Sequence, residues 1–150
     1  MKNLTILVFV LLVFFAKPSH TQNLTVYRAK KSVSATTQRI VSIIKDKDLI
    51  FFETVSHDQI AEDRGIDIDH TNVILFEDPD LTSNLILCEQ TAALDLPLKI
   101  LVWEENEDVY IGYIDPQLMR RRFLIDGCDE TLKEMTGLVV RIINEALKES

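Results

Sequence analysis

The sequence predicts an α+β fold: a two-layer sandwich in which long helices cover one face of an antiparallel sheet. Residues 33–47 and 130–147 each place apolar side chains along one helical stripe, which is typical of helices that lie on a sheet. Residues 98–104 and 109–114 each alternate with the period of two that strands have, and a short polar segment joins them. Two such neighbouring strands pair as an antiparallel hairpin.

The first 22 residues have the pattern of an export signal. Lys2 supplies a positive start, and residues 4–16 form an apolar run interrupted only by Thr5. This run is shorter than the roughly 20 residues that span a bilayer, and it matches a signal-peptide core of roughly 7–15 residues. We expect cleavage near Gln22 and a periplasmic or secreted protein with no stable membrane anchor. An uncleaved anchor is the alternative.

Residues 23–150 have the length of one ordinary domain. Loss of Lys2 and Lys17 with the signal, without any Asp or Glu, moves the formal charge from −8 to −10. This acidity argues against nucleic acid as a partner, because phosphates require a basic face. It equally disfavours an anionic membrane surface.

The first half of the domain alternates strands and helices. Residues 24–30 read as a strand, and Ser32 or Ser34 can cap the helix that runs to about Lys47. Residues 49–56 are rich in aromatic and β-branched side chains, which favours a second strand.

In the middle of the domain, residues typical of helix ends and turns indicate where the elements begin and end. Asp58 starts a short helix over residues 59–64, and Gly65 suits the left-handed position that ends it. Residues 72–77 are apolar on both sides, which is typical of an interior strand. The turn signal Asp78-Pro79-Asp80 follows. A brief helix over residues 81–87 and a crossing segment over residues 89–95 then lead to the hairpin.

The hairpin can be paired residue by residue. A four-residue loop, Glu105–Asp108, sets Trp103 opposite Tyr110. One face is apolar throughout, and we assign it to the core: Leu98, Ile100, Val102, Val109, Ile111 and Tyr113. The other face carries Lys99, Leu101, Trp103, Tyr110, Gly112 and Ile114. Because exposed apolar patches mark contact sites, we predict a homodimer through Leu101, Trp103, Tyr110 and Ile114.

The chain ends in two helices. Pro116 suits the first turn of a helix that runs to about Phe123, with Asp115 as its cap. Gly127 breaks this helix, and Asp129 caps the last helix, over residues 130–147.

Two cysteines, Cys88 and Cys128, have two interpretations. In an oxidising compartment they can form a disulfide, worth roughly 4 kcal/mol by loop closure. Alternatively they are two buried thiols that pack as small apolar residues.

His57 is the leading candidate for a ligand contact or proton donor, because it stands between a strand and a helix beside Asp58. The alternative is a histidine that caps the following helix or hydrogen-bonds to a backbone carbonyl. Asp67, Asp69 and His70 match no metal-site spacing, and we interpret them as a solvated loop. Arg120-Arg121-Arg122 can hold an anion, but we expect these arginines to pair with the protein's own carboxylates.

The chain resembles the family known as domain of unknown function 302. The resemblance rests on residues 93–103, which contain Leu96-Pro97-Leu98-Lys99, on Tyr113-Ile114-Asp115-Pro116, on Phe76-Glu77-Asp78-Pro79 and on the segment after His57. It implies a β-α-β(4)-α fold of the TATA-binding-protein-like kind, often dimeric, with no established activity. The chain departs from the family pattern at Glu77 and at the hairpin tip, where the family tends to have glycine.

We therefore expect a non-enzymatic, dimeric binding module for a small ligand or a protein partner, without metal or cofactor. No serine stands in an elbow motif and no glycine-rich loop is present to hold phosphate. The alternative is an enzyme, a hydrolase or a thiol-redox protein, that uses His57 or the pair Cys88 and Cys128.

Overall fold

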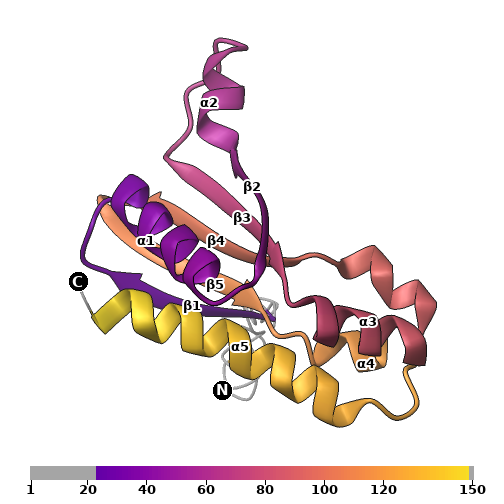
Figure 1. Cartoon of the computed structure of the whole chain (residues 1–150). Coiled ribbons are helices and arrows are strands. Elements are labelled where there is room, and N and C mark those ends of the chain that lie inside the picture. Colours follow the sequence, from indigo (N-terminus) through magenta and orange to yellow (C-terminus); the bar gives the residue numbers. More distant parts are fainter. Residues whose placement is uncertain (1–22, 149–150) are drawn as a thin grey trace, which may run out of the picture.

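The computed structural model describes residues 23–148, which form one antiparallel sheet with helices on one of its faces (Figure 1). The predicted export signal lies outside the described residues. The strands are β1 (Leu24–Ala29), β2 (Ile50–Ser56), β3 (Thr71–Glu77), β4 (Leu98–Glu105) and β5 (Asp108–Ile114). The helices are α1 (Val33–Asp46), α2 (His57–Glu62), α3 (Pro79–Cys88), η1 (Gln90–Asp95), α4 (Leu118–Arg122) and α5 (Asp129–Lys148).

The five strands lie in the order β1-β5-β4-β3-β2, and every neighbouring pair is antiparallel. Strand β3 lies inside the sheet, as its apolar pattern indicated. Apart from the short helices, the element order is β-α-β-β-β-β-α. The predicted α+β two-layer fold is therefore confirmed.

Helix α1 begins where the sequence indicated. The Ser32 hydroxyl oxygen accepts a hydrogen bond from the Ala35 backbone N–H at 3.3 Å, so it satisfies one of the free amides of the first turn. The apolar stripe of α1 points at the sheet, and Ile40, Ile43 and Ile44 are fully buried. The Lys47 side chain at the end of this helix pairs with Glu145 of α5 at 2.8 Å.

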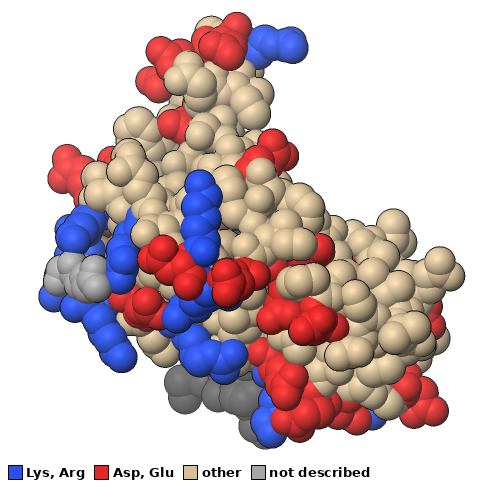
Figure 2. Space-filling model, viewed as in Figure 1, with Lys and Arg blue, Asp and Glu red and all other residues tan. Residues whose placement is uncertain are grey.

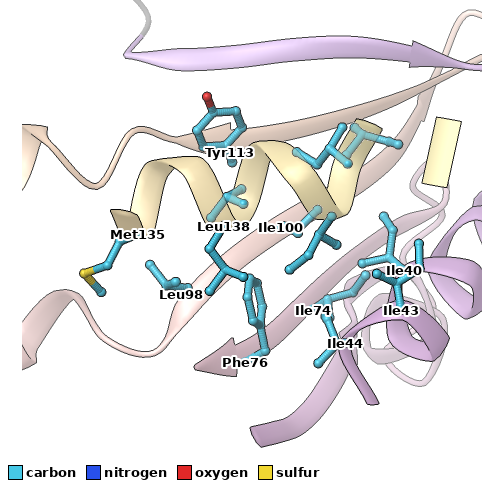
Figure 3. Close-up of a cluster of buried hydrophobic side chains, with 14 of the residues drawn as sticks. Ile40, Ile43, Ile44, Ile74, Phe76, Leu98, Ile100, Tyr113, Met135 and Leu138 are labelled. Carbon is cyan, nitrogen blue, oxygen red and sulfur yellow. The ribbon is translucent and has the colours of Figure 1, made fainter. Parts of the chain in front are cut away.

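The core lies between α1, α5 and the inner face of the sheet. Figure 3 shows Ile40, Ile43 and Ile44 meeting Ile74 and Phe76 of β3, with Met135 and Leu138 of α5 on the other side of Ile100 and Leu98. The β4–β5 hairpin contributes Ile100, Val102 and Ile111 to this layer, all at 0% exposure. The predicted inner face of the hairpin is therefore the buried one.

The hairpin turn is tighter than the sequence suggested. The predicted pairing of Trp103 with Tyr110 is present, but the ladder continues to Glu105 opposite Asp108. Only Asn106 and Glu107 remain in the turn, with φ angles of 52° and 69°. The four-residue loop was wrong, because a two-residue turn with positive φ matches the right-handed twist of the paired strands better.

The segment predicted as a turn at Asp78-Pro79-Asp80 instead starts α3. One Asp78 carboxylate oxygen accepts from the backbone N–H groups of Asp80 and Leu81 at 3.0 and 3.1 Å, and Pro79 occupies the first turn. Helix α3 is thus longer than predicted. The crossing segment that follows it is the 3-10 helix η1.

Strands β2 and β3 extend away from the helical layer and carry α2 at their far end (Figure 1). We call residues 57–70, which comprise α2 and the segment after it, the arm. Helix α2 begins at His57, two residues earlier than predicted, and Gly65 follows it at φ 73° as expected. The arm exposes Ile60, Ile66 and Ile68 to more than two fifths of their surface.

Cys88 and Cys128 are bonded to each other. The bond joins the last residue of α3 to the residue before α5, with 6.4 Å between the two Cα atoms. It closes a loop with a sequence separation of 40 residues, which contains η1, the hairpin and α4. The disulfide therefore links the end of α3 to the start of α5, and so connects the segments before and after the hairpin.

Replacing both cysteines, in Cys88→Ala/Cys128→Ala, should lower the free energy of unfolding by about 2–4 kcal/mol, because the unfolded chain gains the entropy of the open loop. Urea unfolding of the oxidised wild type and the variant measures this difference. Reductant should shift the unfolding midpoint of the wild type and leave the variant unchanged. Equal midpoints for oxidised wild type and variant would contradict the stabilising role.

Candidate functional site

The sheet face that points away from α1 and α5 is predominantly apolar. The strand register places side chains of all five strands on it. We call this surface the open face. Its apolar members are Leu24, Val26, Ile50, Val55, Val73, Leu75, Leu101, Trp103, Tyr110 and Ile114. Val26 is 44% exposed and Ile114 is 66% exposed. Among the described residues, the helices that pack on the sheet lie on the opposite side.

Trp103 and Tyr110 lie on the neighbouring strands β4 and β5 of the open face, toward the hairpin turn. Their rings are stacked, with centroids 5.4 Å apart and planes 30° from parallel. The indole of Trp103 lies over Gly112, where an added Cβ would stand 2.9 Å from the indole Cζ3 atom. The absence of a side chain at Gly112 therefore lets the indole lie flat on the sheet.

The basic groups of the open face make contacts within the chain, whereas Glu53, Glu77 and Glu105 of the same face have no ion pair among the described residues. Arg28 of β1 pairs with Asp108 of β5 across the sheet. Lys99 donates to the backbone oxygens of Asp95 and Pro97 at 2.7 Å each. Burial lowers the pKa of Lys99, although the nearby Asp95 carboxylate opposes this shift. The centre of the face is left with aromatic and aliphatic side chains.

Of the arm's histidines, His70 rather than His57 faces a hollow. His57 is exposed at the start of α2 and does not line the depression beside it. That depression has a volume of about 420 Å³ and is lined by Asp58, Glu62, Gly65, Ile66, Asp67, Ile68 and His70. Figure 2 shows acidic side chains beside a basic one at the top of the molecule, where the arm ends, and further acidic side chains over its middle and lower right.

Asp58 and His70 form the polar centre of the arm. One Asp58 carboxylate oxygen lies 2.8 Å from His70 Nδ1, and the other accepts from the Thr71 backbone N–H at 3.3 Å. The pair joins the start of α2 to the start of β3, so it fixes the base of the arm. Sequence reasoning noted both residues separately but not the pair, because they lie twelve positions apart.

The contact between Asp58 and His70 shifts the pKa values of both side chains. The hydrogen bond to the Asp58 carboxylate raises the pKa of His70 above 6.5. Burial acts to raise the pKa of Asp58, but the hydrogen bonds from His70 and Thr71 together outweigh it, so that this pKa lies below 3.8. Within residues 23–148, no group of His, Cys, Asp or Glu side chains is placed to hold a metal ion.

Two of the arginines in the basic run pair with carboxylates, as expected. Arg120 pairs with Asp129 at the start of α5, and Arg122 pairs with Asp95 at 3.0 Å. Arg122 also lies over the Phe123 ring, 5.6 Å from its centroid. These two side chains therefore serve contacts within the fold.

The sequence model of the family described as "Domain of unknown function DUF302" matches residues 25–143. The chain belongs to this family. A crystal structure described as an uncharacterised conserved protein DUF302 from Bacillus stearothermophilus superposes with a TM-score of 0.69 at 16% sequence identity. The superposition covers 85% of this chain and 97% of that protein, and it supports the DUF302 fold.

Longer proteins contain a segment similar to this DUF302 chain. Two are named fluoride-specific ion channel FluC 1, from Brucella suis biovar 1 (strain 1330) and Brucella abortus biovar 1 (strain 9-941). Each is 28% identical over 118 residues, or 75% of this chain. The chain spans 46% and 44% of these relatives, less than half of their length. In the described part of the DUF302 chain, no helix has the length and apolar character of a membrane span.

Gly112→Ala tests the fit of the indole on the sheet. The added methyl group collides with the Trp103 ring at 2.9 Å, so either the ring or the strand must move. We expect a loss of about 1–3 kcal/mol in unfolding free energy, together with a changed Trp103 fluorescence spectrum. Gly65→Ala is the control for fluorescence, because nothing lies within 4 Å of a Cβ placed there. An unchanged spectrum in Gly112→Ala would contradict the contact.

Asp58→Asn tests the pair at the base of the arm. In the wild type, the raised pKa of His70 contributes stability that is complete below pH 6.5 and is lost as the pH rises through the raised value. The lowered pKa of Asp58 contributes stability above pH 3.8 that is lost as the pH falls through the lowered value. The stability difference between wild type and Asp58→Asn should therefore be largest between about pH 4 and 6.5.

NMR titration supplies the direct measurement for this pair. In Asp58→Asn, the pKa of His70 should move back toward 6.5. In Asp63→Asn, whose carboxylate has no hydrogen bond to this histidine, it should stay raised. A His70 titration that is the same in all three proteins would show that the pair does not form in solution.

Proposed function

We propose that this protein is an exported, non-enzymatic binding module that works as a homodimer, with the open faces of two copies packed together. The observation that carries the proposal is the open face itself. It holds a tryptophan, a tyrosine and aliphatic side chains on a sheet surface that the described helices leave uncovered. Contiguous apolar surfaces of this kind mark contact sites.

The size of the open face suits a sheet-on-sheet interface. Five strands at about 4.8 Å spacing and about six residues at about 3.3 Å give a flat footprint of about 500 Å² per copy. Two copies then bury about 1,000 Å², which is close to the lower limit for a specific interface. Stacked sheets of this type pack about 10 Å apart, so side chains as large as Trp103 can interdigitate.

A second copy of the same chain is compatible with the distribution of charge on the open face. The protein carries a net charge of −8, but Arg28 and Lys99 on the open face already have partners within the chain. The unpaired carboxylates of this face, Glu53, Glu77 and Glu105, lie on the edge strand β2 or at strand ends. Two identical faces that meet about a twofold axis through the apolar middle strands leave these carboxylates at the rim of the interface. A strongly basic partner would gain little from this apolar centre.

The signal-like pattern of residues 1–22 supports export. A disulfide between Cys88 and Cys128 fits the same interpretation, because disulfides persist in oxidising compartments. The FluC relatives support the modular character of the domain, since a similar segment of 118 residues occurs there within a longer chain.

The alternative of an enzyme gains less support from the geometry. His57 is exposed and lies outside the hollow of the arm. Both sulfurs of the proposed redox pair are engaged with each other at the ends of α3 and α5, away from the arm in Figure 1. We therefore favour binding over catalysis, where titratable groups would converge on one cavity.

Ile114→Lys tests the dimer. Ile114 is 66% exposed, so its replacement should leave the fold intact, but the proposed dimer would bury one new ammonium group from each copy. We expect the dissociation constant of the dimer to rise at least about tenfold. Native mass spectrometry and sedimentation equilibrium of the protein from the exported fraction measure it.

Leu87→Lys is the matched control, because Leu87 is 84% exposed on α3 and lies outside the open face. This variant should dimerise like the wild type. A wild type that stays monomeric at high micromolar concentration would refute the dimer. Equal loss of dimer in both variants would place the interface elsewhere.

A further inference from the structure

A second hollow lies on the helix side of the sheet, between α1, the edge strand β2 and its neighbour β3. Its volume is about 370 Å³, within the usual range of ligand pockets. From α1 it is lined by Thr37, Gln38 and Lys45, and from the strands by Phe51, Ser56 and Asn72. We call this hollow the α1–β2 groove.

The floor of the α1–β2 groove is polar at positions where the sheet is otherwise apolar. The register sets Thr54 opposite Ile74, and Ser56 opposite Asn72, so all four side chains share the inner face with the buried core. Ile74 is fully buried, but the polar residues beyond it face the groove. Thr54, Ser56 and Asn72 are half-buried, so their polar groups can be reached by water or by a bound molecule.

Several of these groups retain hydrogen-bonding capacity. The Asn72 amide nitrogen donates to the Thr37 hydroxyl oxygen at 3.2 Å, which leaves the Asn72 oxygen to accept from another group. Ser56 stands at the cap position of α2 but makes no capping hydrogen bond with its side chain. Thr37 is only 7% exposed, so the contact between α1 and β3 fixes one wall of the groove.

The groove also differs in charge from the rest of the surface. The chain has 24 acidic and 16 basic residues, yet no acidic side chain lines this groove. The cation at its end is Lys45, whose Nζ atom lies 4.8 Å above the centroid of the Phe51 ring. A carboxylate next to Lys45 would gain a charge-assisted hydrogen bond. A single lysine suits one carboxylate better than a phosphate, because phosphate sites typically contain bidentate arginine side chains or several hydrogen-bond donors.

A bulge in β2 supports the assignment of this region to binding. The register between β2 and β3 shifts between Phe51 and Glu53, next to the strand residues that line the groove. Bulges redirect side chains and are enriched beside functional sites. Here the shift places the Phe51 ring under Lys45 while Thr54 and Ser56 stay on the groove side.

We propose that the α1–β2 groove binds a small hydroxylated carboxylate of the sugar-acid class. The carboxylate pairs with Lys45, and the hydroxyl groups hydrogen-bond to Asn72, Ser56 and Gln38. The proposal deepens the binding function proposed above by naming a ligand class. It does not require the dimer, because the groove and the open face lie on opposite sides of the sheet.

Isothermal titration calorimetry with D-galacturonate and D-gluconate tests the proposal, with D-galactose and acetate as comparison ligands. We expect saturable binding of at least one sugar acid, and at least tenfold weaker binding of galactose, which lacks the charge, and of acetate, which lacks the hydroxyl groups. Lys45→Met and Asn72→Leu should each weaken the sugar acid at least tenfold. Lys133→Met on α5 removes an equal charge outside the groove and should bind like the wild type.

Several results would overturn the proposal. These are the absence of saturable binding by either sugar acid, equal binding of galactose, or equal affinities in Lys45→Met, Lys133→Met and the wild type. Thermal unfolding of each variant checks that the fold is retained, and Thr54→Val replaces Asn72→Leu as the floor variant should the latter unfold. Titration of the Ile114→Lys protein separates the two proposals, because its groove should bind sugar acid even when the protein is monomeric.

Discussion

The one-sided burial of the β4–β5 hairpin is the constraint on which the rest of the structure depends. Ile100, Val102 and Ile111 pack under the two long helices and leave no exposed surface. Because strand side chains alternate with a period of two, this choice commits Trp103 and Tyr110 to the opposite face. A shift by one residue would expose the core set and bury the aromatic pair, so the apolar inner face specifies the register.

The two candidate surfaces follow from how two helices cover five strands. Helices α1 and α5 seal the middle of the inner face, but β2 and the far end of β3 extend past them. The inner face turns polar there, at Ser56 and Asn72, and the α1–β2 groove takes the place of packed core. On the opposite side the described helices leave the sheet open. One layer of helices therefore produces both an apolar surface and a polar groove.

Features that depend on neighbouring residues were predictable from the sequence, whereas contacts between distant residues were not. The pairing of Trp103 with Tyr110 was predictable, since it depends only on alternation and on a short connection. The turn was predicted too long because polar Glu105 and Asp108 read as loop, whereas they pair with each other. The pair of Asp58 and His70 was missed because the chain turns back between these residues, and their contact depends on where β3 begins. For the same reason His57, the residue that the local pattern favoured, lies outside the hollow.

The sequence by itself determined the fold class, the family and the face of each long element that is buried. The fold class and the buried faces follow from periodicity, which is a property of neighbouring residues. The family follows from the resemblance of short motifs such as Leu96-Pro97-Leu98-Lys99. Only the tertiary structure decided that Cys88 meets Cys128, that His70 meets Asp58, and that Thr37, Lys45 and Asn72 line one groove. Those contacts join residues that are 40, 12 and up to 35 positions apart. Contacts between residues so far apart in the sequence depend on how the sheet and the helices pack, and no local pattern in the chain encodes them.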